Sequence, residues 1–188
     1  MAEACLIDND VLLKVCAYDL VDEFLELFGS SPLLVLAAAP YVVEGIINRT
    51  SRITDKARAS AGLRRLIAAA SIVEPDADEI QAAADLEERA HQGGWELDSG
   101  ESILFSLLSN GKAELLVTGD KRAITALENV APSLPEHSPI VGKVVGFEQL
   151  IVAMIEQNSP EAIAQKICAE PKVDKAIAIC FRCSSGNF

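Results

Sequence analysis

The stretch Cys5–Leu13, CLIDNDVLL, decides the fold. The apolar run Cys5–Ile7 ends directly at Asp8, and apolar residues at helical spacing begin at Val11. A short apolar strand that passes into a helix is the repeating unit of α/β proteins, and functional groups gather where such strands end. A carboxylate directly after a buried strand costs free energy unless it is paired or binds a metal. Asp8 is therefore the first candidate functional residue, with Asp10 two positions later.

Composition limits the classes of protein to consider. The chain has 188 residues and is 50% hydrophobic, which suits one domain with a sizeable core. Sixteen basic against 28 acidic residues give a net charge of −12, which argues against non-specific binding to nucleic acid or anionic membranes as the main role. Neither a signal peptide nor an apolar run of roughly 20 residues is visible, so we expect a cytoplasmic protein. The odd number of cysteines, five, predicts that all are reduced.

Short apolar runs alternate with helical patterns along the rest of the chain. The pattern predicts one helix over Val11–Phe28, stopped by Gly29. Further strands are expected at residues 31–40, 71–75, 114–118 and 140–145, and further helices at 40–48, 54–70, 76–90, 100–110, after Asp120, at 147–157 and twice within 159–181. This alternation predicts a three-layer α/β/α fold with a mostly parallel central sheet. We expect residues 1–157 to form the domain and residues 158–188 a short helical appendage.

Four acids are expected to meet at one edge of this sheet. Asp8 and Asp120 each close an apolar strand, and the carboxyl ends of adjacent parallel strands converge. Glu44 lies four residues after Pro40, in the opening turns of the helix after the second strand. Glu101 lies in a first helical turn and shares a face with apolar side chains, so it should point inward. Crowded acids repel one another unless a cation joins them, and oxygen-only ligands favour Mg²⁺ or Mn²⁺.

Each of these acids also has a simpler interpretation. Asp98 and Glu101 have the D-x-x-E spacing of a capping box at a helix start, and Asp98 competes with Glu101 as a metal ligand. Asp120 fits a turn that caps the following helix, and Glu44 fits a solvated surface acid. Asp10 fits either a group that supports or binds the metal or a cap of the next helix. The combination of the acids, rather than any single one, predicts a metal site.

Three stretches carry a resemblance to a known family: LIDNDVLL (6–13), PYVVEGIINR (40–49) and GESILFSLLSNGKAELLVTGD (100–120). With the order and spacing of the elements between them, over about residues 4–157, the chain resembles a PIN domain. This is the metal-dependent ribonuclease fold of toxins in bacterial toxin–antitoxin pairs and of RNA-processing proteins. The resemblance implies a parallel sheet flanked by helices and an acidic cluster that holds one or two Mg²⁺ or Mn²⁺ ions.

Carried over position by position, the resemblance assigns the acids individual places. The first-strand acid is Asp8, the helix glutamate Glu44, the acid before the penultimate strand Glu101, and the acid after "VT" Asp120. Thr118 matches the hydroxyl residue that precedes the last acid and would steady its loop. The implied activity is metal-dependent endonucleolytic hydrolysis of RNA, and the implied partners are RNA and an inhibitory antitoxin or other protein. The two short helices expected within residues 159–181 offer a surface for a second copy of the chain or another partner.

A basic stretch is the expected counterpart for RNA. Between Arg49 and Arg65 lie six basic residues and one acid. Arg49, Arg52 and Lys56 have i, i+3, i+7 spacing, and on one helical face they could follow a phosphate backbone. Thr118 and Lys121 are further candidate substrate contacts. A solvated helix face, or a docking site for an acidic protein segment, explains the same charges.

Two other functions fit the first motif. The chain could be a PIN-like module that binds nucleic acid or protein without catalysis, which its acidic balance favours. It could also be a haloacid-dehalogenase-like phosphatase with Asp8 as nucleophile and Asp10 as general acid. Against the phosphatase, Ile124 stands where that family has a further acid, and there is no room for its cap insertion. The pair Cys180 and Cys183 has metal-ligand spacing, but two ligands do not make a zinc site.

Overall fold

The centre of the molecule is a parallel β-sheet. The computed structural model describes residues 3–130, 140 and 142–183. The five strands of the sheet have the order β3-β2-β1-β4-β5, and every pairing is parallel. The strands are β1 (Cys5–Ile7), β2 (Leu33–Leu36), β3 (Ala70–Val73), β4 (Leu115–Thr118) and β5 (Val144–Gly146). The predicted α/β fold with a mostly parallel sheet is confirmed.

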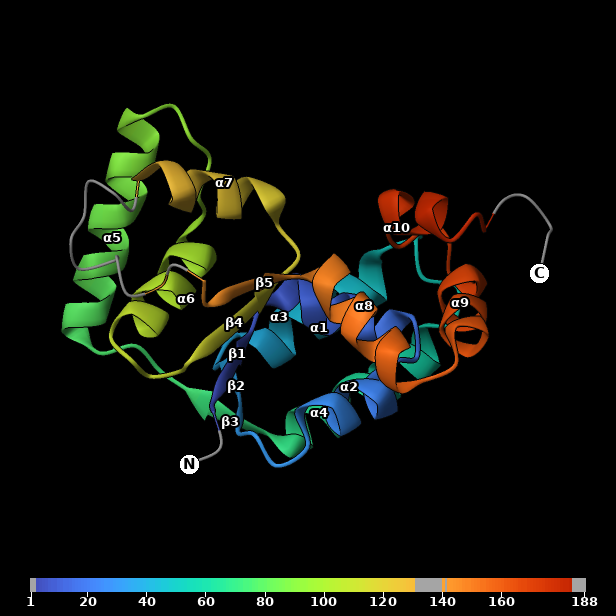
Figure 1. The fold of residues 1–188 in the computed structure, drawn as a ribbon. Coiled ribbons are helices and arrows are strands. Elements are labelled where there is room, and N and C mark those ends of the chain that lie inside the picture. The colour runs from blue at the N-terminus through green and yellow to red at the C-terminus, as the bar shows by residue number, and fades with distance from the viewer. Residues whose placement is uncertain (1–2, 131–139, 141, 184–188) are drawn as a thin grey trace.

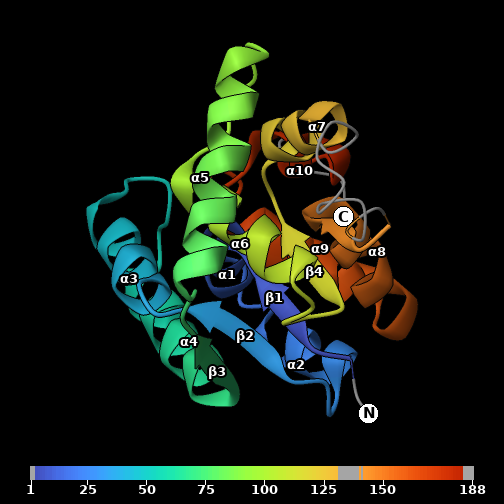
Figure 2. The same cartoon turned by 90° about the vertical axis from the view of Figure 1, so that its left-hand side faces the viewer.

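Helices cover both faces of the sheet and make it the middle of three layers (Figures 1 and 2). One face carries α1 (Asn9–Ala17), α2 (Val21–Phe28), α3 (Ala39–Arg49), α4 (Lys56–Ala69) and α8 (Phe147–Gln157), and the other carries α5 (Ala77–Gln92), α6 (Ser99–Ser109) and α7 (Lys121–Val130). Strand β1 shows why both faces need cover. Cys5 and Ile7 are buried in the first core and Leu6 in the second, because successive side chains of a strand point to opposite faces.

The structure corrects some predicted boundaries. The single helix expected over Val11–Phe28 is two helices, separated by a corner at which Asp19 has the left-handed φ of 58°. Tyr18 and Leu20 on either side of Asp19 are fully buried, so the apolar pattern continues through the corner and hides it. The strand expected at residues 140–145 is reduced to β5, and the proline-rich segment 131–139 lies outside the described residues.

The two helices expected at the C-terminal end are present as α9 (Pro160–Ala169) and α10 (Lys175–Cys180). They pack on the first core, where Ile163, Ile167 and Ile177 join the side chains of β1 and β2. The carboxylate of Glu170, which is 1% exposed, accepts hydrogen bonds from the backbone N–H groups of Thr54 (2.8 Å) and Asp55 (2.9 Å). The described part of the C-terminal region, residues 158–183, is therefore packed against the rest of the molecule.

A disulfide joins Cys168 of α9 to Cys183 beyond α10. The prediction that all five cysteines are reduced is therefore wrong for these two. Cys5 and Cys16 are free and buried, and Cys180 is free and exposed. Cys180 and Cys183 of the CxxC pair do not act together, because Cys183 forms its disulfide with Cys168 and Cys180 is free. Separately, none of the helices within the described part of the chain is both long and apolar enough to cross a bilayer.

Candidate functional site

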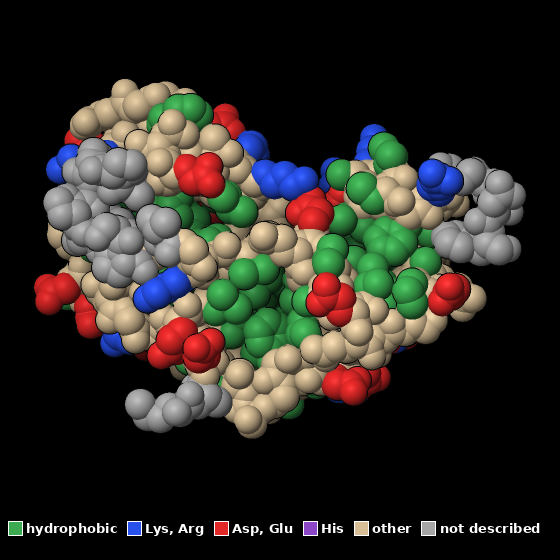
Figure 3. Space-filling view, in the orientation of Figure 1, with side chains coloured by type: hydrophobic (Ala, Val, Ile, Leu, Met, Phe, Trp, Pro, Cys, Tyr) green, Lys and Arg blue, Asp and Glu red, His purple; other side chains and the backbone are tan. Residues whose placement is uncertain are grey.

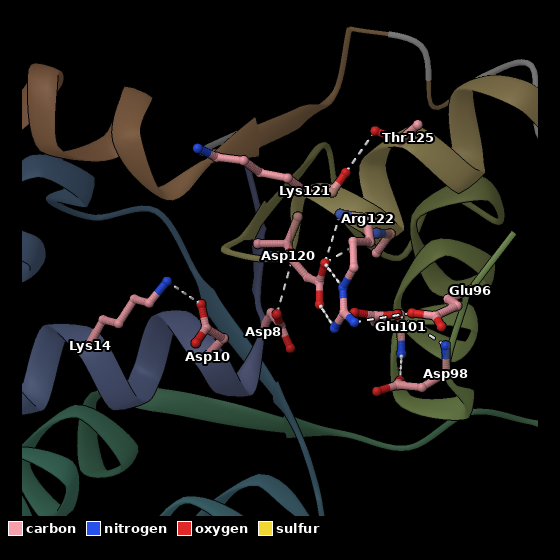
Figure 4. A network of polar contacts seen from close by, with 12 residues as sticks. Asp8, Asp10, Lys14, Glu96, Asp98, Glu101, Asp120, Lys121, Arg122 and Thr125 are labelled. Atoms are coloured by element: carbon pink, nitrogen blue, oxygen red, sulfur yellow. Dashed lines mark hydrogen bonds and ion pairs between the residues drawn. The ribbon is translucent and has the colours of Figure 1, made fainter. Parts of the chain in front are cut away.

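The candidate site lies at the carboxyl edge of the sheet, between β1 and β4. The chain winds outward from β1 through β2 and β3 on one side and then returns to β4 and β5 on the other. Ligands bind α/β sheets at such a reversal of strand order. Asp8 follows β1 and Asp120 follows β4. A hollow of about 650 Å³ at this point is lined by five carboxylates, which we call the acidic hollow: Asp8, Asp10, Asp98, Glu101 and Asp120 (Figure 4).

Asp8 is the most enclosed of these acids. It occupies the N-cap position of α1 and is 8% exposed. Its backbone N–H donates to the carbonyl of Val117 (3.0 Å), and its Oδ2 accepts a hydrogen bond from the hydroxyl of Thr118 (2.9 Å). The pKa of Asp8 is raised to about 6, chiefly by burial and also by the negative charges of Asp10 and Asp98, while the hydrogen bond from Thr118 acts to lower it. The surroundings of Asp8 thus disfavour its charged form.

Asp98 and Glu101 form the capping box that their spacing indicates. Asp98 Oδ1 accepts from the backbone N–H of Glu101 (2.9 Å), and Glu101 Oε2 accepts from the N–H of Asp98 (3.0 Å). Partial burial nevertheless raises the pKa of Glu101 to about 7, with further contributions from the charges of Asp98, Asp120 and Asp8. Asp98 and Glu101 can therefore cap α6 and also line the acidic hollow.

Asp120 is held by an arginine that the sequence interpretation overlooked. Arg122 Nη2 lies 3.0 Å from Asp120 Oδ2, and the Arg122 backbone N–H donates to Oδ1 (2.7 Å). Partial burial acts to raise the pKa of Asp120, but the hydrogen bonds from Arg122 outweigh it, and the pKa lies below its ordinary value. Arg122 also pairs with Glu96 (3.1 Å) (Figure 4). The contact between Arg122 and Asp120 was predictable from the sequence, because the two residues lie two positions apart at the start of a helix.

Asp10 is neutralised by a second overlooked cation, Lys14, one helical turn away in α1. Lys14 Nζ lies 2.7 Å from Asp10 Oδ2 and 2.7 Å from Asp174 Oδ2, and 5.2 Å from the centre of the Phe147 ring. A Cβ on Gly119 would lie 1.8 Å from Asp10 Oδ2, so the backbone after β4 approaches this pair closely. The i, i+4 spacing of Asp10 and Lys14 could have predicted their ion pair from the sequence. No sequence pattern relates Lys14 to Asp174.

Glu44 does not join the other acids, so the expected convergence of four carboxylates is wrong for this one. Helix α3 turns Val42 and Ile46 toward the acidic hollow. Glu44, two residues from each, faces α4, where its Oε1 accepts a hydrogen bond from the hydroxyl of Ser60 (3.0 Å). Residues two apart on a helix point to different sides.

The predicted basic face is not formed as a helical surface. Helix α3 ends at Arg49 and α4 begins at Lys56, so these residues and Arg52 do not share one helix. Arg49 Nε donates to the carbonyl of Gly45 (2.9 Å), and Lys56 Nζ donates to that of Asn48 (2.8 Å). Arg52 is exposed and lines a neighbouring hollow together with Lys14.

The two remaining substrate candidates are engaged within the protein. Thr118 is 2% exposed, so the prediction of a substrate contact is wrong for it. Its hydroxyl accepts from the N–H of Asp120 (3.2 Å) while it donates to Asp8, which confirms that Thr118 steadies the loop of the last acid. Lys121 pairs with Glu148 of α8 and points away from Asp8 (Figure 4).

The donor chemistry of the acidic hollow suits a divalent cation, but the side chains are not gathered into a ligand set. Across the described ranges, no three Asp, Glu, His or Cys side chains are arranged so that they could hold a metal ion. The ammonium of Lys14 and the guanidinium of Arg122 compensate Asp10 and Asp120 instead. The pKa values of Asp8 and Glu101 are raised chiefly by burial and further by neighbouring carboxylates. Carboxylate oxygens are the ligands that Mg²⁺ and Mn²⁺ prefer.

Comparison with known proteins supports the fold alone. No family model and no curated protein matches the chain. A solved structure, the crystal structure of PAE2754 from Pyrobaculum aerophilum, is similar to 84% of this chain and 98% of its own, with a TM-score of 0.54 and 18% sequence identity. At this identity, the similarity shows a shared α/β architecture.

Proposed function

We propose that the protein is a PIN-type endoribonuclease that depends on Mg²⁺ or Mn²⁺ and hydrolyses phosphodiester bonds of RNA. One observation carries the proposal. Asp8 and Glu101, both with raised pKa values, share one hollow with Asp120 at the reversal point of a parallel sheet. Perturbed acids in a hollow at this position are the expected signature of a catalytic site. The residues that resemble the PIN motifs supply the reaction class.

In this proposal, Asp8, Glu101 and Asp120 hold one or two ions, with Asp98 as a further ligand. A bound Mg²⁺ or Mn²⁺ would stabilise negative charge on the phosphate and favour attack by water. Thr118 orients Asp8 through its hydrogen bond and fixes the loop of Asp120. Arg122 holds Asp120 and balances its charge, and Lys14 does the same for Asp10. Asp10 is thus a supporting residue rather than a direct ligand.

The first test is cleavage of a mixed pool of structured and unstructured RNAs with Mn²⁺, Mg²⁺ or EDTA. Cleavage should need the metal and should be lost in Asp8→Asn. Asp78→Asn is the matched control, because Asp78 is an exposed acid in the first turn of α5. Glu44→Gln should reduce cleavage much less than Asp8→Asn, because Glu44 bonds to Ser60 outside the acidic hollow. Products that persist in EDTA, or in Asp8→Asn, would contradict the proposal.

A catalytically silent binding module is the second candidate. The pairing of Arg122 with Asp120, and of Lys14 with Asp10, favours it, because protein cations already stand beside two of the acids. Titration calorimetry with Mn²⁺ separates the two functions. Absence of Mn²⁺ binding together with absence of cleavage would favour the silent module. An antitoxin, another protein and a second copy of the chain are proposed partners, and light scattering on the purified protein tests the last of these.

A further inference from the structure

We infer that the C-terminal segment builds a binding subsite for the phosphodiester backbone of an RNA strand, directly beside the acidic hollow. The inference rests on the proposed function, since it names where the RNA continues beyond the cleavage site. Its basis is a second hollow of about 690 Å³, which we call the basic hollow. Four cations line it: Lys14, Arg52, Lys172 and Lys175. The other lining residues are Asp10, Asp174 and the small or apolar residues of the 171–176 segment.

The basic hollow is assembled from distant parts of the chain. Lys14 comes from α1, and Arg52 comes from the connection between α3 and α4. Lys172 lies in the connection between α9 and α10, and Lys175 is the first residue of α10. No helical periodicity or local charge run connects these positions, so only the fold brings them together. Lys14 balances part of the charge of the two acids in the lining, and the three other cations leave the hollow with an excess of positive charge, which can attract a negatively charged ligand.

Two acids anchor the C-terminal segment, residues 168–183, on the body of the molecule, and a disulfide closes this segment. Asp174 pairs with Lys14 (2.7 Å) just before Lys175. Glu170, two residues before Lys172, accepts the hydrogen bonds from the 54–55 backbone and pairs with Arg58 (3.4 Å). The disulfide then joins the two ends of this segment to each other. The two exposed lysines therefore stand on an ordered support, which lowers the entropy that ligand binding must remove.

Three of the four cations of the basic hollow have no ion-pair partner among the residues that the structure describes. Over the ranges that the structure describes, the side chains of Arg52, Lys172 and Lys175 form no ion pair or hydrogen bond, and all three residues are exposed. Lys14, by contrast, is shared between Asp10 and Asp174. Three exposed cations therefore surround one hollow of a chain whose net charge is −12. A polyanion would relieve their mutual repulsion and release counterions on binding.

Continuity with the acidic hollow identifies the polyanion as RNA. Asp10 and Lys14 line both hollows, so a strand with its reacting phosphate near Asp8 would pass the Asp10–Lys14 pair into the basic hollow. Basic side chains over the end of α7 and over α10 are also visible on the face that Figure 3 presents. An acidic protein segment would fit the cations but would have no use for the adjoining carboxylates, whereas a nuclease substrate needs both surfaces.

The test measures binding without cleavage. A fluorescein-labelled single-stranded RNA of mixed sequence is titrated in EDTA at several salt concentrations, and its anisotropy is followed. Lys172→Ala/Lys175→Ala should weaken binding about tenfold. It should also make the dependence of log affinity on log salt shallower by about 1.4, the amount for two phosphate contacts on a single strand. The control Arg64→Ala/Arg89→Ala removes two equal charges from exposed positions on α4 and α5, outside the basic hollow.

The outcomes separate this inference from the proposed function. Equal binding by the lysine variant and wild type, or an equal loss in the control, overturns the subsite. Displacement of the RNA by polyglutamate at matched charge overturns the choice of RNA in favour of an acidic protein. Metal-dependent cleavage that needs Asp8, with a KM unchanged in the lysine variant, retains the nuclease and rejects the subsite. Lysine-dependent binding without any cleavage in Mn²⁺ retains the subsite and rejects the nuclease.

Discussion

The hydroxyl of Thr118 connects Asp8 to the backbone of Asp120. It donates to Asp8 Oδ2 over 2.9 Å and accepts the N–H of Asp120 over 3.2 Å. Because Thr118 is buried, water does not compete for either bond. One side chain therefore fixes the orientation of the acid after β1 and the path of the chain after β4, which are the two sides of the candidate site.

Thr118→Val keeps the shape of this side chain and removes both hydrogen bonds. We expect Mn²⁺ affinity to fall by roughly tenfold or more, because residues that orient metal ligands typically contribute that amount. Titration calorimetry measures the change. Thr125→Val is the control, since its hydroxyl donates only to the Lys121 carbonyl on the exposed side of α7. Unchanged Mn²⁺ affinity in Thr118→Val would show that Asp8 does not depend on this contact.

Arg122→Gln should release Asp120. The pKa of Asp120 lies below its ordinary value because of the hydrogen bonds from Arg122, so the substitution should raise this pKa. If Mn²⁺ replaces Arg122 beside Asp120, the variant should bind Mn²⁺ more tightly than wild type. Calorimetry with Arg89→Gln as a charge-matched control checks this. Weaker Mn²⁺ binding would mean that Arg122 supports the occupied site instead of competing for it.

The pH dependence of stability follows from Asp8 and Glu101. Burial raises their pKa values to about 6 and about 7, above the ordinary values of 3.8 and 4.5. At intermediate pH the unfolded chain has lost these protons while the folded chain retains them. The metal-free protein should therefore lose stability as pH rises from about 4.5 to 7. Asp120 and Asp174, with lowered pKa values, oppose this trend only at lower pH.

Thermal melts of the metal-free protein across this pH range measure the effect. Asp8→Asn should flatten the pH dependence, because it removes one of the two groups. Mn²⁺ should stabilise wild type more at pH 7 than at pH 5, because at lower pH the ion must displace protons. A melting temperature of the metal-free protein that rises steadily from pH 4.5 to 7 would contradict the assignment.

Gly119→Ala tests the close approach beside the acidic hollow. The new Cβ would meet Asp10 Oδ2 at 1.8 Å and Lys14 Nζ at 3.2 Å, so the Asp10–Lys14 pair must shift. We expect a loss of about 1–3 kcal/mol in the free energy of unfolding, as for other overpacked sites. Gly45→Ala is the control, because its Cβ would meet only the flexible end of Arg49 at 3.3 Å within a helix. Denaturant unfolding of both variants decides the comparison.

The Cys168–Cys183 disulfide should be measurable as a stability difference. It closes a segment with a sequence separation of 15 residues, and a loop of that size corresponds to up to about 3 kcal/mol in the chain-entropy view. Reductant should lower the melting temperature of wild type and leave that of Cys168→Ser unchanged. Cys180→Ser, at the exposed free cysteine, should behave like wild type. Equal melting with and without reductant in wild type would contradict the bond.

The fold was predictable because buried positions produce a regular pattern of apolar residues in the sequence. Strands such as β2 and β4 are apolar on both faces, and the helices between them repeat apolar residues at helical spacing. Asp8 and Asp120 were found by the general rule that parallel strands end at one edge. The corner at Asp19 was missed because its neighbours remain buried and thus preserve the apolar pattern.

The contacts of the site were less predictable, since they depend on how elements rotate and pack. The side to which Glu44 points follows from the position of α3 against α4, and its partner Ser60 carries no sequence signal. Lys14 and Arg122 lie close in sequence to the acids they pair with, and spacing alone could have identified them. The pairing of Lys14 with Asp174, and of Cys168 with Cys183, joins parts of the chain that no local pattern relates.

The packing of α9 and α10 on the first core limits how the protein can be shortened. Cutting after residue 157 would strip the cover from apolar side chains of the core, leave Lys14 without Asp174, and free the backbone N–H groups of Thr54 and Asp55. A fragment that ends at residue 157 would keep every candidate catalytic acid but would lack part of the hydrophobic core. We therefore expect a stable fragment to extend beyond residue 157 and to include α9 and α10.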